Sequence, residues 1–402
     1  MKRFFSTLIF LLTLLPLAAQ AAPADSIAAD TLRTDSLPLR QRIGALLESP
    51  VFERTQVGIC VYDLTADSLL FAHGERQLLR PASNEKLVTA ITALRTLGTD
   101  YRYRTTFALS DVTERDSVKG GTLYVRAGYD PLLSADDLRA VADSLLARGV
   151  RRLNAVVADL TFKDTKRLGW GWCWDDKEQP LTPLLYDGRD RFAEGLRTAL
   201  GRAGIGWDGT LSEGNVPTEA ATLCTRLRTI DEVLLPMMKR SDNAMAESLF
   251  YQTARHESGT RTPATRRHAV AATERVIRAV GLDPTHYQVA DGSGLSLYNY
   301  LTPQLLVRLL RLAYRDESIR RHLMPSLPVA GEDGTLSRRM RGTAAQGNVR
   351  AKTGTVEGVS TLSGYCTTSA GHVLCFSIMN QGIRHTATGR DFQDRLCREL
   401  VK

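Results

Sequence analysis

Long apolar runs are scarce in this sequence of 402 residues. The longest, Phe4 to Leu17, falls short of the ~20 apolar residues that a membrane-spanning helix needs. Aromatic residues make up 7%, hydrophobic residues 43% and charged residues 24% of the chain. This balance excludes collagen, long disordered chains and polytopic membrane proteins, and the length predicts two or three domains at ~100–200 residues each.

Metal-binding patterns are missing as well. The six cysteines form no C-x-x-C pair, and the seven histidines are scattered without an H-E-x-x-H motif. We therefore expect no metal site. An even number of cysteines permits disulfides if the protein is exported, but six cysteines allow 15 pairings and the sequence does not choose among them. Cys60, Cys366 and Cys375 lie in strand-like apolar runs, which also fits buried free thiols.

Basic residues exceed acidic ones only mildly, with 52 Lys and Arg against 44 Asp and Glu, a net charge of +8. The densest local group is Arg338, Arg339 and Arg341. A nucleic-acid partner would need a basic stripe, so none is expected, whereas mild basicity suits a polyanionic polymer. The G-x-S-x-G elbow of the α/β-hydrolases is also absent, and the glycine-flanked Ser293 lies in a predicted turn.

The N-terminus carries an export signature. Lys2 and Arg3 precede the apolar run, and Ala19-Gln20-Ala21 supplies the small residues that a signal peptidase accepts. We read residues 1–21 as a signal peptide cleaved near Ala21/Ala22, with a retained membrane anchor as the alternative. Residues 22–40, rich in Ala, Asp, Ser and Thr, read as a polar tether, and no stable transmembrane anchor is expected.

Periodicity predicts an α+β protein. Val57, Ile59 and Val61 alternate as in a strand, and the segment from Ser83 to Gly98 has helical spacing with a glycine stop. From residue 103 the hydrophobic pattern changes and predicts short strands around a helix at 134–148. Ser134 and Asp137 approximate a capping box for that helix. We therefore predict a core over 41–102 and 180–402, split by a small α+β insert at 103–179. The other elements expected are a helix at 41–47, strands at 69–71, 103–109, 122–127, 153–159, 349–355, 360–367 and 372–380, and helices at 191–203, 229–239, from 243 and at 390–400.

A serine and a lysine three residues apart open the predicted helix. Positions i and i+3 share a helix face, so the amine of Lys86 should lie beside the hydroxyl of Ser83. A serine hydroxyl is a weak nucleophile, and a neighbouring lysine held neutral by burial or by other cations can accept its proton. Alone, S-x-x-K is a weak signal, since an exposed serine and a solvated lysine give the same pattern.

Two further short motifs follow in order. Ser241-Asp242-Asn243 falls between two predicted helices, where a loop can aim two side chains into a cleft. Lys352-Thr353-Gly354 falls in a predicted strand, where Lys352 and Gly354 should face one side and the glycine should leave room for a ligand. The combination of S-x-x-K, S-x-N and K-T-G, each once and in this order, is far more specific than any of its members.

These motifs and several longer blocks resemble the D-alanyl-D-alanine carboxypeptidase/endopeptidase family of penicillin-binding proteins, the class C type with an inserted domain. The resemblance spans most of residues 50–402, and it implies the penicillin-binding protein/serine β-lactamase-like transpeptidase fold with a small inserted α+β domain. The matching blocks are Arg80-Pro-Ala-Ser-Asn-Glu-Lys86, Gly128-Tyr-Asp-Pro-Leu-Leu133, Trp172-Cys-Trp-Asp-Asp176, Lys239-Arg-Ser-Asp-Asn243, Ala290-Asp-Gly-Ser-Gly-Leu-Ser296, Leu327-Pro-Val-Ala-Gly331 with Asp333-Gly-Thr335, and Ala351-Lys-Thr-Gly-Thr355.

The resemblance implies roles for the matching residues. Ser83 would be the nucleophile toward the penultimate D-Ala carbonyl, Lys86 its general base, and Ser241 and Asn243 the proton relay and amide contact. The K-T-G strand would bind the substrate: Lys352 and Thr353 the terminal carboxylate, with Gly354 beside them, and the backbone N–H groups of Ser83 and Thr355 the oxyanion. Lys352 would also add positive potential that keeps Lys86 neutral. The implied enzyme is periplasmic, needs no metal or organic cofactor, acts on peptidoglycan stem peptides and is acylated by β-lactams.

Asp176 matches a family aspartate that contacts the amino end of the stem peptide, although an exposed turn-capping aspartate fits the same pattern. Leu297 and Glu357 depart from residues common in relatives, which leaves the stem specificity open. Two other functions remain: a serine β-lactamase and a catalytically silent wall-binding scaffold. The insert and the Asp-Gly-Ser-Gly block argue against the lactamase, and the complete motifs argue against the scaffold.

Overall fold

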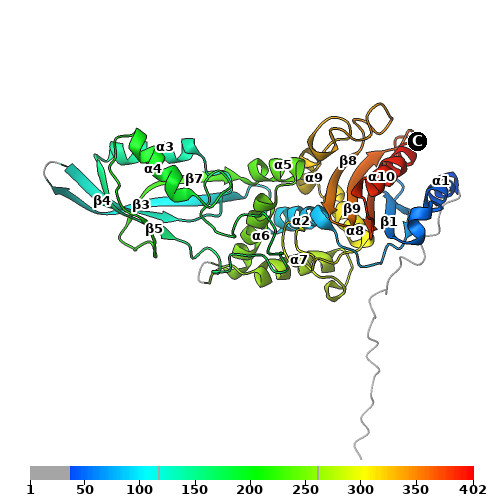
Figure 1. The fold of residues 1–402 in the computed structure, drawn as a ribbon, viewed down its shortest axis with the longest axis horizontal. Coiled ribbons are helices and arrows are strands. Elements are labelled where there is room, and N and C mark those ends of the chain that lie inside the picture. The colour runs from blue at the N-terminus through cyan, green and yellow to red at the C-terminus, as the bar shows by residue number, and fades with distance from the viewer. Residues whose placement is uncertain (1–36, 116–117, 260–261) are drawn as a thin grey trace, which may run out of the picture.

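A computed structural model describes residues 37–115, 118–259 and 262–402. The chain forms two five-stranded sheets, which lie toward opposite ends of an elongated molecule (Figure 1). The first sheet is antiparallel throughout, and β8 is one of its two edge strands. Its strands, in spatial order, are β2 (Ser68–His73), β1 (Gln56–Asp63), β10 (Val373–Gln381), β9 (Val359–Thr367) and β8 (Arg350–Val356).

Helices cover both faces of this sheet, and an apolar cluster lies on each face. The alternating side chains of β1 show how the sheet separates the two clusters. Val57, Ile59 and Val61 face one apolar cluster, while Cys60 and Tyr62 face the other, because successive strand residues point to opposite faces. The first cluster includes side chains of α1 (Leu37–Leu47) and α10 (Thr386–Leu400). The helices that contribute to the second cluster are α2 (Glu85–Leu97), α5 (Ile230–Arg240), α6 (Asn243–Ser258), α7 (Arg266–Ala279), α8 (Pro303–Arg315) and α9 (Glu317–Ser326).

The second sheet has its own core, built with two helices. Ser134 caps α3 as predicted: its hydroxyl accepts a hydrogen bond from the Asp137 N–H at 3.3 Å, and the Asp137 carboxylate accepts one from the Ser134 N–H at 3.0 Å. The strands, in spatial order, are β6 (Leu211–Glu213), β5 (Arg152–Asp159), β4 (Val118–Arg126), β3 (Arg102–Arg115) and β7 (Ala221–Thr229), and the helices are α3 (Ala135–Ala147) and α4 (Phe192–Arg202). The described residues also form four 3-10 turns, η3 (Pro50–Glu53), η4 (Ala82–Asn84), η5 (Pro284–His286) and η6 (Gly334–Leu336).

Two boundaries differ from the sequence prediction. The segment 180–229 was predicted to belong to the same core as residues 41–102. It contains α4, β6 and β7, and their side chains pack into the core of the second sheet. The sequence prediction did not group these elements with the insert because β7 pairs with β3, more than 100 residues earlier in the chain, and local patterns do not report such pairing. Helix α1 also begins at Leu37, so the last four residues of the expected tether are helical. The predicted signal peptide, residues 1–21, and the rest of that tether lie outside the described residues.

All six cysteines are free thiols in the structure. Cys60, Cys366 and Cys375 are buried, which is the apolar role considered for them from the sequence, and Cys397 is buried too. Cys224 is partly covered and Cys173 is exposed. Among the helices of residues 37–115, 118–259 and 262–402, none is long and apolar enough to cross a membrane.

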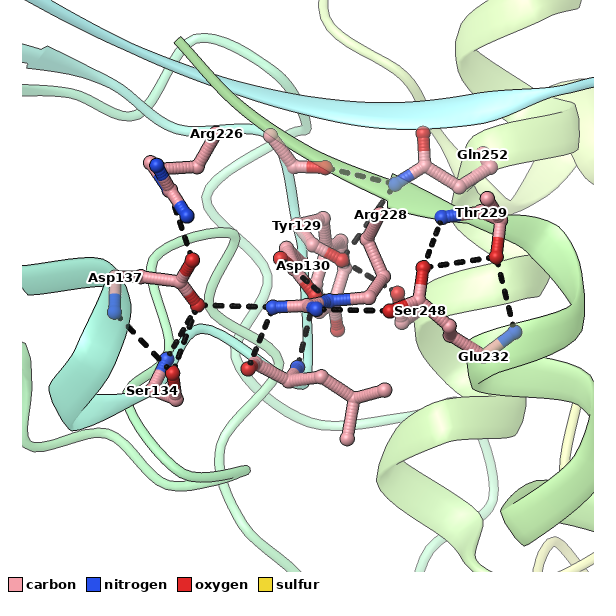
Figure 2. A network of polar contacts seen from close by, with 12 residues as sticks. Tyr129, Asp130, Ser134, Asp137, Arg226, Arg228, Thr229, Glu232, Ser248 and Gln252 are labelled. Atoms are coloured by element: carbon pink, nitrogen blue, oxygen red, sulfur yellow. Dashed lines mark hydrogen bonds and ion pairs between the residues drawn. The ribbon is translucent and has the colours of Figure 1, made fainter. Parts of the chain in front are cut away.

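A polar network joins the second sheet to α5 and α6, two of the helices that pack beside the first sheet (Figure 2). Arg228, at the end of β7, donates to the Asp137 carboxylate at 2.8 Å, to the Leu132 carbonyl at 3.1 Å and to Glu232 on α5 at 3.0 Å. On the adjacent helix α6, Ser248 donates to the Tyr129 carbonyl at 2.5 Å. One guanidinium therefore links three segments at the junction.

Loss of this link should destabilise the protein. Arg228→Met leaves the Asp137 carboxylate, only 7% exposed, without one of its cations, and the expected loss in the free energy of unfolding is about 3 kcal/mol. Arg126→Met is the matched control, because Arg126 is 59% exposed and its pair with Asp159 should be worth at most about 1 kcal/mol. Denaturant unfolding of both variants checks this, and equally small losses would contradict it.

Candidate active site

The three motifs meet at one place, between the helices and the edge strand β8. Ser83 lies in the turn η4, and Lys86 lies in the first turn of α2. Ser241 ends α5 in a left-handed conformation, and Asn243 begins α6 two residues later. Lys352 projects from β8 and donates to the Ser241 hydroxyl at 2.8 Å. The structure thus brings together side chains that are up to 269 positions apart in the sequence, from Ser83 to Lys352.

The amine of Lys86 is fully buried and has three oxygen partners. Its Nζ lies 3.0 Å from Ser83 Oγ, 2.6 Å from Asn243 Oδ1 and 2.7 Å from the Ser293 carbonyl oxygen. The amide and carbonyl oxygens can only accept, whereas the serine hydroxyl can also donate. A neutral amine would donate to the Asn243 amide oxygen and to the Ser293 carbonyl oxygen. Its lone pair would then point at the Ser83 hydroxyl, which is the geometry that a general base needs.

Burial also favours the neutral form of this amine. It lowers the pKa of Lys86 from 10.5 to about 8, against the opposing effect of nearby carboxylates, Asp291 and Glu247 foremost. Burial likewise lowers the pKa of Lys352 well below its ordinary value, and the charge of Lys86 adds to this. Lys352 donates to the Thr353 carbonyl at 2.7 Å as well as to Ser241, so an ammonium there would keep one N–H for a ligand.

The turn that carries Ser83 is held from two sides without space for a methyl group. A Cβ on Gly354 would lie 2.1 Å from Thr361 Oγ1 and 3.0 Å from the Ser83 nitrogen. A Cβ on Gly294 would lie 1.8 Å from the Ala82 carbonyl oxygen. Gly354 therefore makes room for the serine turn, and it shares a side of β8 with the buried Lys352, as predicted. Its place beside a ligand stays a prediction.

Two buried carboxylates fix the Asp-Gly-Ser-Gly turn behind Lys86. Glu247 on α6 accepts from the Gly292 and Ser293 N–H groups at 3.0 and 2.9 Å. Asp291 accepts from backbone N–H groups of the turn, including that of Gly294 at 2.8 Å, and from the Trp172 indole at 2.9 Å. Burial, together with the nearby charge of Asp291, raises the pKa of Glu247 to about 8. These contacts position the Ser293 carbonyl that accepts from Lys86.

Glu85, next to Lys86, is an unusual buried acid. Both of its carboxylate oxygens lack a hydrogen-bond partner within the described part of the chain, and its side chain is fully buried. Burial raises the pKa of Glu85 well above its ordinary 4.5, with Asp291 and Glu247 adding to the effect. The folded protein therefore binds the Glu85 proton more tightly than the unfolded chain does. The resulting contribution to the free energy of unfolding is fully present below about pH 4.5 and is lost as the pH rises through the folded-state pKa.

Replacing this acid with an apolar side chain should therefore stabilise the protein at alkaline pH. We expect Glu85→Met to be more stable than the wild type at pH 8, and the difference to shrink by up to about 1.4 kcal/mol per pH unit on acidification toward pH 5. Denaturant unfolding at several pH values checks this. Glu219→Met, at an exposed loop position, is the control and should show no such pH trend. A constant difference across the pH range would contradict the argument.

The tryptophan-rich segment reaches the site through a residue that the sequence analysis did not select. Asp176 accepts from the Cys173 N–H at 2.6 Å, which is the turn-capping arrangement considered as its alternative role. Glu178, two residues later, accepts from Asn243 Nδ2 at 2.5 Å and so directs the Asn243 carbonyl oxygen toward Lys86. In the sequence, only the position of Glu178 between Asp176 and Pro180 pointed to a role in the site. Across the described ranges, no group of three or more His, Cys, Asp or Glu side chains is placed to hold a metal ion.

Comparison with known proteins bears on this site. A family model described as the D-Ala-D-Ala carboxypeptidase 3 (S13) family matches residues 39–185 and 185–400. A D-alanyl-D-alanine carboxypeptidase of Actinomadura sp. is 31% identical, and the alignment covers 90% of this chain and 84% of that protein. The carboxypeptidase DacB of Mycolicibacterium smegmatis is 30% identical, with 85% and 79% covered.

Two solved structures have a similar fold. Penicillin-binding protein 4 (dacB) of Haemophilus influenzae superposes with a TM-score of 0.79 at 22% identity, covering 90% of this chain and 99% of that one. It has also been solved in complex with a β-lactam. A predatory endopeptidase of Bdellovibrio bacteriovorus, solved with an immunity protein, has a TM-score of 0.59 at 17% identity, covering 86% and 93%.

Proposed function

Because the chain belongs to the D-Ala-D-Ala carboxypeptidase 3 (S13) family, we propose that it cleaves D-alanyl bonds of peptidoglycan stem peptides through an acyl-enzyme on Ser83. It is a hydrolase with the serine-type carboxypeptidase and endopeptidase chemistry of that family. The observation that carries the residue assignment is the buried Lys86 amine, 3.0 Å from the Ser83 hydroxyl and held by two other oxygens that only accept.

In the acylation step, Lys86 takes the proton of Ser83 as Oγ attacks the carbonyl carbon of the penultimate D-Ala. The new Oγ–C bond forms a tetrahedral intermediate, whose oxyanion the N–H groups of Ser83 and Thr355 stabilise. When the C–N bond breaks, the departing amine takes the proton back from Lys86, by way of Ser241. Water then attacks the acyl carbon and Lys86 takes its proton. When the Oγ–C bond breaks, Lys86 returns the proton to Ser83 Oγ, and the peptide leaves as a carboxylic acid.

Strand β8 and the S-x-N loop hold the substrate. Since β8 is an edge strand, an extended peptide can pair with its free side. Its terminal carboxylate binds the ammonium of Lys352 and the hydroxyl of Thr353, while Asn243 contacts the peptide amide. A carboxylate beside Lys352 favours the charged form of that lysine, and this charge in turn keeps Lys86 neutral. Asp176 stays a proposed contact for the amino end of the stem.

We assign the enzyme to the periplasm after removal of residues 1–21, and β-lactams to the role of covalent inhibitors at Ser83. We place the insert at residues 102–229 and the core at 41–101 and 230–402, because the strands of the second sheet run from Arg102 to Thr229. No metal or organic cofactor takes part in the reaction as written. The substrate is a wall peptide, and nucleic acid is not a partner.

The test uses the mature protein with two purified muropeptides and one drug. Release of D-alanine from a disaccharide pentapeptide, or separation of a cross-linked dimer into its two stems, followed by chromatography and mass spectrometry, is the expected result. Incubation with benzylpenicillin should add one drug mass that persists. Rapid drug turnover without an adduct would instead indicate a β-lactamase. Neither cleavage nor an adduct would indicate a catalytically silent scaffold.

A further inference from the structure

A pocket beside Ser83 is lined in part by Thr353 and Thr355 of β8. It has a volume of about 440 Å³, within the range of sites that hold drug-sized ligands and larger than a departing alanine requires. The lining carries hydroxyl groups and three arginines, Arg338, Arg339 and Arg390, and no carboxylate. The hydroxyls include those of Ser83 and Thr355, so the pocket is continuous with the proposed reaction site.

Only one of the three arginines is neutralised. Arg339 donates to the Asp394 carboxylate at 2.6 and 2.9 Å, and also to the backbone carbonyl of Arg390 at 3.3 Å. This last contact brings the start of α10 beside the loop after η6. Arg338 and Arg390 are exposed, and neither forms an ion pair with another residue that the structure describes. Two uncompensated cations among hydroxyls form a site that favours an anion.

The position of these cations relates them to the departing half of the substrate. On the proposed function, Lys352 and Thr353 bind the carboxylate beside the scissile bond, and this is the sole carboxylate of a departing D-alanine. In a cross-linked wall, the departing amine belongs to a second stem peptide, which extends past this point and carries further carboxylates. Such a leaving group would pass from β8 into the pocket.

We infer that Arg338 and Arg390 form a subsite for a further carboxylate of the departing stem peptide, and that they favour cross-linked peptides over single stems. The inference rests on the proposed function and deepens it. The two side chains contact the leaving group and take no part in proton transfer, so they set specificity and not reactivity. Arginine suits this role because its planar guanidinium can donate two parallel hydrogen bonds to a carboxylate.

The experiment compares two substrates on one variant. For R338Q/R390Q, we expect kcat/KM on a cross-linked muropeptide dimer to fall about tenfold, while kcat/KM on the monomeric pentapeptide falls less than threefold. The rate on the dimer should also become less sensitive to salt, because two ion pairs are lost. R398Q is the matched control: Arg398 is exposed on the same helix and does not line the pocket, so both substrates should react as with the wild type.

An equal loss on both substrates, or no loss on either, would overturn the subsite. If the wild type cleaves both peptides and the double variant is unchanged, the proposed function stands and the subsite alone fails. If the wild type cleaves neither, both fail. Benzylpenicillin adduct formation and the thermal midpoint of R338Q/R390Q verify its fold, and the single variants R338Q and R390Q, each expected to show a part of the dimer effect, serve if the double variant does not fold.

Discussion

Ser83→Ala is expected to abolish both peptide cleavage and the penicillin adduct. Among the described partners of the buried Lys86 amine, the Ser83 hydroxyl at 3.0 Å is the one that can become covalently attached to a carbonyl carbon, so we expect no acyl-enzyme without it. We expect the rate on the pentapeptide to fall at least about 10³-fold, since the nucleophile and its base act as a unit. Intact mass after incubation with benzylpenicillin should show no added drug.

This result needs a control for folding and for other nucleophiles. Ser369→Ala, at an exposed position after β9, should keep the adduct and the activity of the wild type. Thermal unfolding of Ser83→Ala should resemble that of the wild type, because the serine side chain is only partly buried. An adduct of one drug mass on Ser83→Ala would place the nucleophile elsewhere and refute the assignment.

The second large effect is expected at Lys86. Lys86→Met removes the base while retaining an apolar side chain of similar length, and the acylation rate should fall about 10³-fold. Lys86→Arg should be as slow, because a guanidinium stays protonated in proteins and cannot accept the proton of Ser83. Stopped-flow acylation with a fluorescent penicillin measures both. Retained acylation in Lys86→Arg would show that the residue supplies charge and not a base.

The pH dependence of the wild type gives an independent check on this role. A base acts only when it is unprotonated, and burial lowers the pKa of Lys86 to about 8. The acylation rate should therefore rise about tenfold per pH unit below pH 7 and level off above pH 8. In Lys86→Met this rise should disappear. A wild-type rate that is flat between pH 6 and 9 would contradict the assignment of Lys86.

Much of the site could be predicted because its signals are local. The serine and lysine share a helix turn, Ser241 and Asn243 follow a helix end, and Lys352 occupies a strand, so each motif indicates its own backbone. The capping box at Ser134 and the alternation from Val57 to Val61 were predicted for the same reason. What joins the motifs in space was supplied by the family resemblance.

The features that sequence reasoning missed depend on contacts between distant segments. Glu178 acquires a function only when the chain after the tryptophan-rich block lies against Asn243. Arg338 belonged to the densest basic group in the sequence, but its proposed role depends on Arg390, 52 positions later, which lines the same pocket. The packing role of Gly354 was missed because its close neighbours, Pro81 and Ser83, come from the other half of the core.

The six thiols differ in their exposure to solvent, and this difference allows selective labelling. Cys173 is exposed, whereas four of the other five are buried, and it lies in the turn that Asp176 closes, five residues before Glu178. A thiol-reactive dye under native conditions should therefore attach first at Cys173, without any engineered cysteine. Attached there, the dye would sit five residues along the chain from Glu178, which accepts a hydrogen bond from Asn243. Its emission could then report, in real time, the arrival and departure of wall fragments that leave no colour or mass change of their own.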